Sequence, residues 1–306
     1  MTLARPLRLG TRGSPLALVQ AHMVAAALRK AHGWAEDAIA IVPVKTTGDA
    51  VQDRPLAEIG GKALWTKELD RALLDGAIDF AVHSMKDVET IRPEAIRIAA
   101  MLPRADVRDR LIGATGIATL PHGARIGSSS PRRAAQLRHL RPDVTIVPFR
   151  GNVETRLRKL AEGEADATLL AAAGLERLGR PDIGHAIPID VMLPAPAQGA
   201  VGIEARMHDA ATLAVLAAID HAETHICVAT ERAFLAALGG GCHSPVAALA
   251  VREGGLLSLR AALFDEQGTH HMNGHRRFAE PAQAAELADW LLGEAPPAIT
   301  ALFAGR

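Results

Sequence analysis

The sequence predicts an α/β protein of two similar lobes, followed by a smaller C-terminal α+β domain. Through the first two thirds of the 306 residues, apolar runs of strand length alternate with runs of helical period. This alternation is typical of α/β layers with largely parallel strands. Each half also contains a strand that leads into a Ser-Pro helix start beside arginine, so the two lobes are predicted to share one design.

The first lobe is predicted to begin with a strand at 7–10 and a helix that ends before Gly33. Ser14 is placed to cap this helix and Pro15 to occupy its first position, because serine accepts amide hydrogen bonds and proline has no amide hydrogen to leave unpaired. Gly33 is a typical helix stop. The other expected elements, up to about residue 103, are a strand at 39–45, a helix at 64–75 and a strand at 78–82.

The second lobe is predicted to start after the charged stretch 104–110. Ser130 and Pro131 repeat the helix start of the first lobe, and Asn152 caps a further helix that Gly163 ends. The expected elements are strands at 125–127, 144–148 and 165–171 and helices at 130–139 and 152–162. The α+β domain follows, with a helix at 222–238 and strands at 246–251, 256–264 and 274–278.

The composition is typical of an ordinary globular protein and does not indicate a particular class of binding partner. The 34 Lys and Arg residues balance 34 Asp and Glu residues, so no bulk charge favours nucleic acid or a membrane surface. The N-terminal residues MTLARPLRLGTRG contain no signal-peptide core, which predicts a cytoplasmic location. The longest stretch without charged side chains, 233–251, is interrupted by three glycines and Pro245, so no membrane span is predicted.

Basic residues are concentrated between Arg125 and Lys159, where nine Lys and Arg residues face two acidic residues, a local excess of seven positive charges. Arg132 and Arg133 fall in the first turn of a predicted helix, where backbone amides already attract anions. Two arginines there are unfavourable by about 0.3–1 kcal/mol each, so an anionic ligand is the simplest compensation. The guanidinium fork suits carboxylate or phosphate. The alternative is a solvated basic face with surface ion pairs.

Two further positions are candidates for chemistry. Asp87 lies in HSMKDV, directly after an apolar strand, where α/β sheets bind ligands, and its carboxylate is suited to hold positive charge on a substrate nitrogen. A turn or cap role is the alternative. Cys242 follows three glycines, a turn in which an accessible thiol can attach a ligand covalently. Cys227, within an apolar helix, is interpreted as a small buried hydrophobic residue.

The stretch 46–69 is polar and punctuated by glycine and proline, as expected of a mobile loop over a site. Lys62 and Trp65 are placed to reach into that site, unless the stretch is a surface loop with a buried tryptophan. His270, His271 and His275 lie near a predicted turn without a fourth ligand at metal spacing, so no metal site is predicted.

Nine segments, in order from Thr11 to Cys242, resemble the motif series of porphobilinogen deaminase. They are TRGSPLAL, TTGD, IGGKALWTKEL, AVHSMKDV, GSSSPRRAAQL, FRGNVETRL, AGLERLG, PAPAQGAVGIE and GGGC. The resemblance implies two lobes like those of periplasmic binding proteins and a smaller domain that carries a cofactor cysteine. It implies domains at 1–103 plus 201–221, at 104–200 and at 222–306, in a cytoplasmic protein that we expect to be a monomer.

The same resemblance implies an enzyme of tetrapyrrole (haem and porphyrin) biosynthesis. Cys242 would carry a dipyrromethane primer through a thioether, four porphobilinogen molecules would be added with loss of ammonia, and water would release hydroxymethylbilane. Asp87 would be the catalytic residue, which stabilises the positive pyrrole nitrogens and assists proton transfer. Lys62 and Trp65 would belong to the active-site loop. The residues that would bind substrate and cofactor carboxylates are Arg12, Ser14, Lys86, Ser129, Ser130, Arg132, Arg133, Arg150, Arg156 and Arg177.

Two positions depart from the family pattern. Ala197 stands where the family often has glycine, and it would restrict the chain there if the backbone needed a positive φ. Trp65 stands where phenylalanine is common and would narrow the cleft. Neither change touches the proposed chemistry.

Two other functions also fit parts of the sequence. A two-lobed binding module for a small anionic solute would use the same lobes but needs no reactive thiol. A nucleic-acid binder would use the basic segment, but Phe149 is the only aromatic residue between Arg125 and Lys159, and stacking residues are expected in such proteins.

Overall fold

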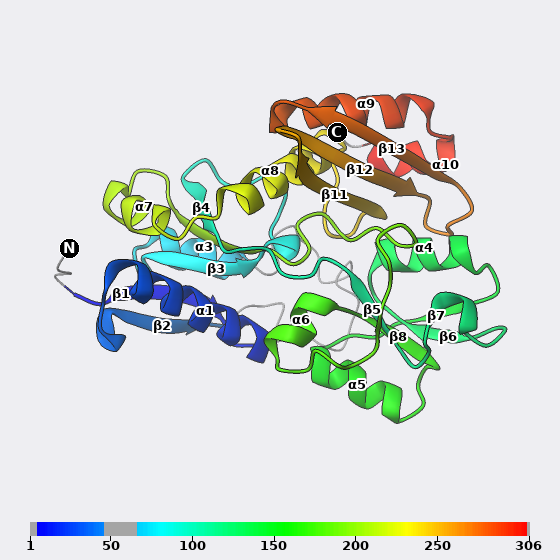
Figure 1. Cartoon of the computed structure of the whole chain (residues 1–306), viewed down its shortest axis with the longest axis horizontal. Coiled ribbons are helices and arrows are strands. Elements are labelled where there is room, and N and C mark those ends of the chain that lie inside the picture. The colour runs from blue at the N-terminus through cyan, green and yellow to red at the C-terminus, as the bar shows by residue number, and fades with distance from the viewer. Residues whose placement is uncertain (1–4, 46–65, 305–306) are drawn as a thin grey trace. The chain divides into compact units, whose positions relative to one another are not determined.

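The computed structural model describes residues 5–45 and 66–304, which form two compact units (Figure 1). One unit consists of Met1–Arg104 and Ala200–His225, and the other of Ala105–Gly199 and Ile226–Arg306. Each unit contains a five-stranded sheet, and the second also contains a three-stranded sheet. The domain boundaries implied by the family resemblance stay predictions, because the second unit combines two of the expected domains.

The sheet of the first unit has the order β2-β1-β3-β10-β4. Strand β1 pairs in parallel with β2 and β3, whereas β10 is antiparallel to both β3 and β4. The strands are β1 (Leu7–Arg12), β2 (Ile39–Val44), β3 (Phe80–Ser84), β4 (Ile96–Met101) and β10 (Val201–Arg206). Strand β10 therefore comes from a segment that begins about a hundred residues after the end of β4.

The sheet of the second unit repeats this arrangement, with the order β7-β6-β8-β5-β9. Strand β6 pairs in parallel with β7 and β8, and β5 is antiparallel to β8 and β9. The strands are β5 (Asp109–Ile112), β6 (Arg125–Gly127), β7 (Thr145–Val147), β8 (Ala167–Ala171) and β9 (His185–Ala186). Two similar α/β lobes are thus confirmed. The sheets are mixed rather than largely parallel, because each accepts one reversed strand.

The helix of the first lobe forms where its capping residues predict it. Helix α1 spans Pro15–His32, the Ser14 side chain accepts a hydrogen bond from the Ala17 amide, and Gly33 follows at φ 65°. Val24 and Leu28 of α1 pack with Leu9 and Phe80 in one buried core. The unit also contains η1 (Glu36–Ala38), α3 (Lys67–Leu74), η2 (Met85–Asp87) and α7 (Ala210–Ala217).

The helices of the second lobe follow the same rules. Ser130 caps α4 and Asn152 caps α5, each accepting a hydrogen bond from an amide three residues on. Gly163 ends the second of these at φ 76°. The elements are η3 (Ile117–Thr119), α4 (Pro131–Leu140), α5 (Val153–Ala161) and α6 (Ala172–Arg177).

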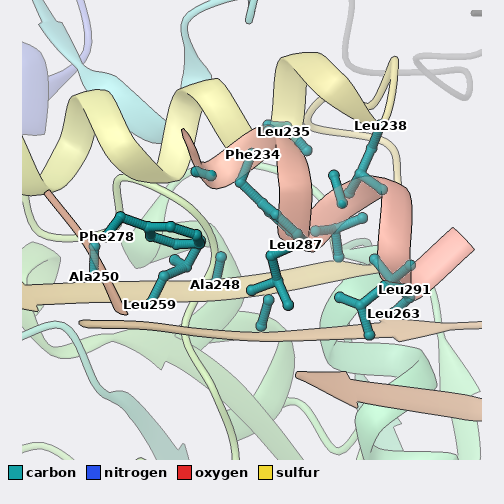
Figure 2. Close-up of a cluster of buried hydrophobic side chains, with 14 of the residues drawn as sticks. Phe234, Leu235, Leu238, Ala248, Ala250, Leu259, Leu263, Phe278, Leu287 and Leu291 are labelled. Atoms are coloured by element: carbon teal, nitrogen blue, oxygen red, sulfur yellow. The ribbon is translucent and has the colours of Figure 1, made fainter. Parts of the chain in front are cut away.

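The three-stranded antiparallel sheet confirms the predicted C-terminal α+β domain. Phe234, Leu259 and Leu287 lie within its buried apolar core, where α8 and α9 meet one face of the sheet (Figure 2). The elements are α8 (Ala222–Ala237), β11 (Val246–Glu253), β12 (Leu256–Phe264), β13 (His271–Phe278), η4 (Pro281–Gln283), α9 (Ala284–Glu294), α10 (Pro297–Thr300) and η5 (Ala301–Phe303). The expected strand at 274–278 begins earlier, at His271, so His271 joins His275 on β13.

A buried carboxylate joins this domain to the second lobe within the same unit. Glu231 of α8 is fully buried, and it accepts hydrogen bonds from the amides of Ala197, at 2.6 Å, and Ala250, at 2.8 Å. Ala197 has φ 61°, the one positive value of a residue other than glycine in the described ranges 5–45 and 66–304. Residue 197 therefore has the left-handed backbone in which glycine is favoured. The alanine that stands there is strained.

We predict that Ala197→Gly raises the free energy of unfolding by about 1 kcal/mol, because relief of left-handed strain exceeds the extra chain entropy of glycine. Urea unfolding followed by tryptophan fluorescence measures the change. Ala26→Gly, at an exposed position inside α1, is the matched control and should lower stability by about 1 kcal/mol. Equal losses in both variants would show that Ala197 is not strained.

Candidate functional site

Asp87 lies in a small pocket at the ends of two parallel neighbouring strands. Arg12 is the last residue of β1, and Asp87 follows β3 on the short helix η2. Because both strands end at the same edge of the sheet, their side chains meet there. Asp87, Arg12 and Ser14 line one pocket, together with Gln20, Thr66, His83 and Ser84. Lys86, also on η2, is half-buried.

The segment that carries Asp87 is held from both sides. The Met85 amide donates to the Ala200 carbonyl at 3.1 Å, and the Met85 side chain is buried. Gly202 on β10 allows this, since a Cβ there would lie 2.1 Å from the Met85 sulfur. The Gln20 amide nitrogen of α1 donates to the Ser84 hydroxyl at 2.8 Å. The end of β3 is therefore fixed against both α1 and β10.

A buried group of charges lies beside this pocket. The Arg92 guanidinium donates to Glu204 at 2.8 Å, to Asp70 at 2.5 Å and to Glu89 at 2.8 Å. Nε2 of His83 lies 3.1 Å from Oε2 of Glu204, without hydrogen-bond alignment. Burial opposes the charge on Glu204, but its contacts with His83 and Arg92 outweigh burial and lower its pKa to about 2. Burial is also the main cause that raises the pKa of Asp70.

In the second lobe, Arg132 and Arg133 are buried and share one carboxylate. Both lie in the first turn of α4, with 3% and 5% of their surface exposed. Each donates to a different oxygen of Asp109 on β5, at 2.7 Å. Gln198 donates to the same carboxylate at 3.0 Å. Burial raises the pKa of Asp109, but the two guanidinium groups outweigh this and hold it well below its usual range.

We expected an anionic ligand to balance the charges of Arg132 and Arg133, and Asp109 supplies part of that balance. One carboxylate faces two guanidinium groups, so the buried group keeps one positive charge. Nε of Arg132 is buried without a hydrogen-bond partner among the residues that the structure describes, and burial lowers the pKa of this residue. A buried excess charge is unfavourable without a partner, so the group remains suited to an anion.

The other predicted anion-binding residues surround the ends of β7 and α6. The Ser129 hydroxyl donates to the Phe149 carbonyl at 2.8 Å, and Arg156 donates to the Gly151 carbonyl at 3.1 Å. Arg177 donates to the Gly199 carbonyl at 2.6 Å, and burial lowers its pKa. Arg150, directly after Phe149, is half-buried.

Part of the predicted basic segment is an ordinary protein surface. Arg125, Arg158 and Lys159 form exposed or partly exposed ion pairs with Asp166, Glu162 and Glu164. Such pairs contribute little to stability. The alternative of a solvated face therefore holds for these residues, and not for the buried Arg132 and Arg133.

Cys242 is exposed, whereas Cys227 is buried in the core of the C-terminal domain. Cys242 lies on the turn between α8 and β11. Gly239, at the start of this turn, has φ 64°. The Gly241 amide donates to the Ser244 hydroxyl at 3.1 Å. The turn thus presents a thiol at the surface, the requirement for a covalent attachment point. The predicted loop residues Lys62 and Trp65 lie outside the described residues.

The described ranges contain no group of three His, Cys, Asp or Glu residues arranged for a metal ion. Within the same ranges, no single helix is long and apolar enough to cross a membrane. Only α7 and α8 together reach that length, and they are bent by 115° at the break between them.

Sequence reasoning missed Asp109, Gln198, Glu204 and Arg92. Asp109 belonged to a stretch interpreted as a charged connection, and its strand β5 is only four residues long. Glu204 and Gln198 lie in the quoted PAPAQGAVGIE segment, but no local pattern shows that β10 joins the first sheet. A carboxylate in a short apolar strand is the one available signal, because buried charges require partners.

The fold and these sites define a class of protein with two α/β lobes, an anion-binding group in one lobe, an aspartate pocket in the other, and a small domain that exposes a cysteine. A family model described as "Porphobilinogen deaminase, dipyromethane cofactor binding domain" matches residues 7–214. A second, "Porphobilinogen deaminase, C-terminal domain", matches residues 225–292.

Two named relatives match nearly the whole chain. Porphobilinogen deaminase of Sphingopyxis alaskensis is 61% identical over 305 residues, which cover 98% of this chain and 97% of that protein. Porphobilinogen deaminase of Paracoccus denitrificans is 51% identical over 297 residues, which cover 95% of each. The chain belongs to the porphobilinogen deaminase family.

Two solved structures are distantly similar to this chain. Immunogenic lipoprotein A from Vibrio vulnificus has a TM-score of 0.43 at 14% identity, over 72% of this chain and 96% of that chain. The putative periplasmic sulfonate-binding protein SsuA from Methylobacillus flagellatus has a TM-score of 0.38 at 15% identity, over 74% of this chain and 67% of that chain. The fold class therefore rests on the sheets described above.

We predict that Asp109→Asn lowers the free energy of unfolding at pH 7 by about 3–5 kcal/mol, because it leaves two buried guanidinium groups without a counter-charge. The folded-state pKa of Asp109 lies below its unfolded value. Its contribution is therefore present above an unfolded pKa of about 3.9 and is lost as the pH falls below that value.

Urea unfolding at pH 7 and at lower pH tests this prediction. The difference between wild type and Asp109→Asn should shrink as the solution becomes more acidic. Asp166→Asn, which removes an exposed ion pair with Arg125, is the matched control and should change stability little. A loss no larger in Asp109→Asn than in the control would contradict the prediction.

Proposed function

We propose that this chain condenses porphobilinogen head to tail on a primer attached to Cys242, with Asp87 as the catalytic residue. Family membership establishes the activity, a transferase reaction of tetrapyrrole biosynthesis with a dipyrromethane cofactor. The assignment of roles to individual residues is the proposal. The observation that carries it is the buried Arg132–Arg133–Asp109 group, whose remaining positive charge matches ligands with several carboxylates.

The donor set fits a dipyrromethane. A thioether to this cofactor needs an accessible thiol, and Cys242 is the exposed one of the two cysteines. The acetate and propionate groups of pyrrole rings need charged donors, and the second lobe offers Arg132, Arg133 and half-buried Arg150. When bound, the dipyrromethane supplies the ring carbon to which the first substrate is added.

The first lobe is proposed to hold the reacting nitrogen atoms. Asp87 is a carboxylate at a strand end, in a pocket that also contains Arg12 and Ser14. A carboxylate there stabilises positive charge that develops on pyrrole nitrogen and orients the ring. Arg12, Ser14 and Lys86 donate to the carboxylates of the same ring. Each charge-assisted hydrogen bond contributes about 1.5–3 kcal/mol when water is excluded.

The second lobe is proposed to hold the carboxylates that accumulate as the chain of rings grows. Ser130 and the α4 amides contribute the positive end of a helix, and Ser129 adds a hydroxyl. Arg156 and Arg177 extend the set, since both already donate to backbone carbonyls and are thereby oriented. The arrangement favours ordered, bidentate carboxylate contacts over diffuse attraction.

The proposal also includes a cytoplasmic location and a monomeric state. A reducing compartment keeps Cys242 available as a thiol for attachment.

We predict that the purified protein is heavier than its amino-acid sequence by the mass of a dipyrromethane, and that Cys242→Ala removes this excess because no thioether can form. Intact-mass spectrometry measures it. Cys227→Ala, which changes the buried cysteine, is the control and should keep the excess. A wild type with only its polypeptide mass, which binds porphobilinogen without releasing ammonia, would instead identify a two-lobed binding module.

We predict that Asp87→Asn keeps the attached primer but loses turnover by at least about 100-fold, because the neutral amide no longer stabilises the positive pyrrole nitrogen. Ammonia release gives the rate, and intact mass gives the loaded fraction. Asp75→Asn, in the exposed turn after α3, is the matched control. Near-normal turnover per loaded Asp87→Asn molecule would remove Asp87 from the mechanism.

A further inference from the structure

His83 is a second ionisable side chain in the pocket of Asp87, and the roles proposed above do not use it. It lies on β3, four residues before Asp87, and lines the same pocket with 6% of its surface exposed. The imidazole is the side chain best suited to accept and return a proton near neutral pH. We therefore consider which residues lie beside the His83 imidazole.

Strand pairing places His83 beside a buried carboxylate. Ala81 and His83 share one face of β3, because successive side chains alternate. Glu204 lies directly opposite Ala81 on β10, so its side chain lies on the same face. Nε2 of His83 is 3.1 Å from the Glu204 carboxylate, which is fully buried. A carboxylate this close to an imidazole stabilises the positive charge that the ring acquires on taking up a proton.

The charges around Glu204 support such a role. Arg92 binds Glu204 with two nitrogens, at 2.8 and 2.9 Å, which keeps the carboxylate fixed and ionised. Asp70 of α3 and Glu89 after η2 bind the same guanidinium. Three carboxylates thus face one guanidinium, and the cluster carries an excess of negative charge apart from His83. On its pocket side His83 faces the site that also contains Asp87 and Arg12.

On the basis of the function proposed above, we propose that His83 is a second acid–base group of the reaction and that Glu204 is its positioning residue. Asp87 then holds positive charge on the substrate, while His83 moves the proton. This separates two tasks that one carboxylate would perform with difficulty, because a carboxylate that accepts a proton no longer stabilises a cation.

The proton balance of each addition is complete without another reactant. The C–N bond of porphobilinogen, which enters as an ammonium ion, breaks with its electron pair on nitrogen and releases ammonia. A C–C bond forms between the freed methylene carbon and the terminal ring carbon of the growing chain. His83 removes the proton from that ring carbon, and the C–H electron pair returns to the ring. His83 then passes the proton to ammonia, so ammonium leaves and the neutral imidazole is restored.

The test compares His83→Gln with the wild type and with His32→Gln. Glutamine keeps a donor for Glu204 but cannot move a proton. His32 lies at the end of α1, contacts the Val215 carbonyl and is outside the pocket, so its replacement controls for the loss of a histidine. Intact mass gives the primer-loaded fraction, thermal unfolding gives stability, and ammonia release gives kcat and KM per loaded molecule.

We expect His83→Gln to keep its primer and its melting temperature while kcat falls about 100-fold or more and KM changes little. Porphobilinogen deuterated at its unsubstituted ring carbon should then react more slowly than ordinary substrate, by a larger ratio than in the wild type, because proton removal has become limiting. His83→Asn serves as a second variant if the first is unstable.

An unchanged kcat per loaded molecule would overturn the proposal, as would an isotope ratio equal to that of the wild type. If neither variant carries the primer, His83 acts in assembly or folding, and the proposal is also overturned. A wild type that releases no ammonia would instead refute the proposed function itself, so the two failures are distinguishable.

Discussion

The carboxylate of Asp109 organises the second lobe, because it is the buried counter-charge for both guanidinium groups at the start of α4. Gln198 binds the same carboxylate and so ties the segment before β10 to strand β5. A shared carboxylate fixes the two arginines with little loss of conformational freedom on binding. It also leaves them one positive charge in a region of low dielectric, where attraction to an anion is strong.

The first lobe has the opposite balance. Arg92 is surrounded by Glu204, Asp70 and Glu89, beside the pocket that contains Asp87. The two sheets have the same pattern of strand pairing, yet the buried charges beside them differ. Three carboxylates face one guanidinium in the first lobe, and two guanidinium groups face one carboxylate in the second.

Local signals predicted much of this fold, and long-range pairing explains what they missed. Ser14, Ser130 and Asn152 cap the helices that they were expected to cap, because capping depends on neighbouring residues alone. The reversed strands β5 and β10 depend on partners far along the chain, and no local pattern shows that their charged residues, Asp109 and Glu204, are buried. Arg132 and Arg133 were predicted to bind anions, but their burial against Asp109 was not predicted, for the same reason. The roles of the site residues came from the ordered motifs, and their ligand contacts stay predictions.

The most direct test of this account is a crystal structure of the primer-loaded protein. We expect carboxylate oxygens of the dipyrromethane about 2.7–2.9 Å from the guanidinium nitrogens of Arg132 or Arg133, with both arginines still bound to Asp109. A primer whose carboxylates contact neither arginine, with their guanidinium groups bound to Asp109 and backbone carbonyls alone, would contradict it.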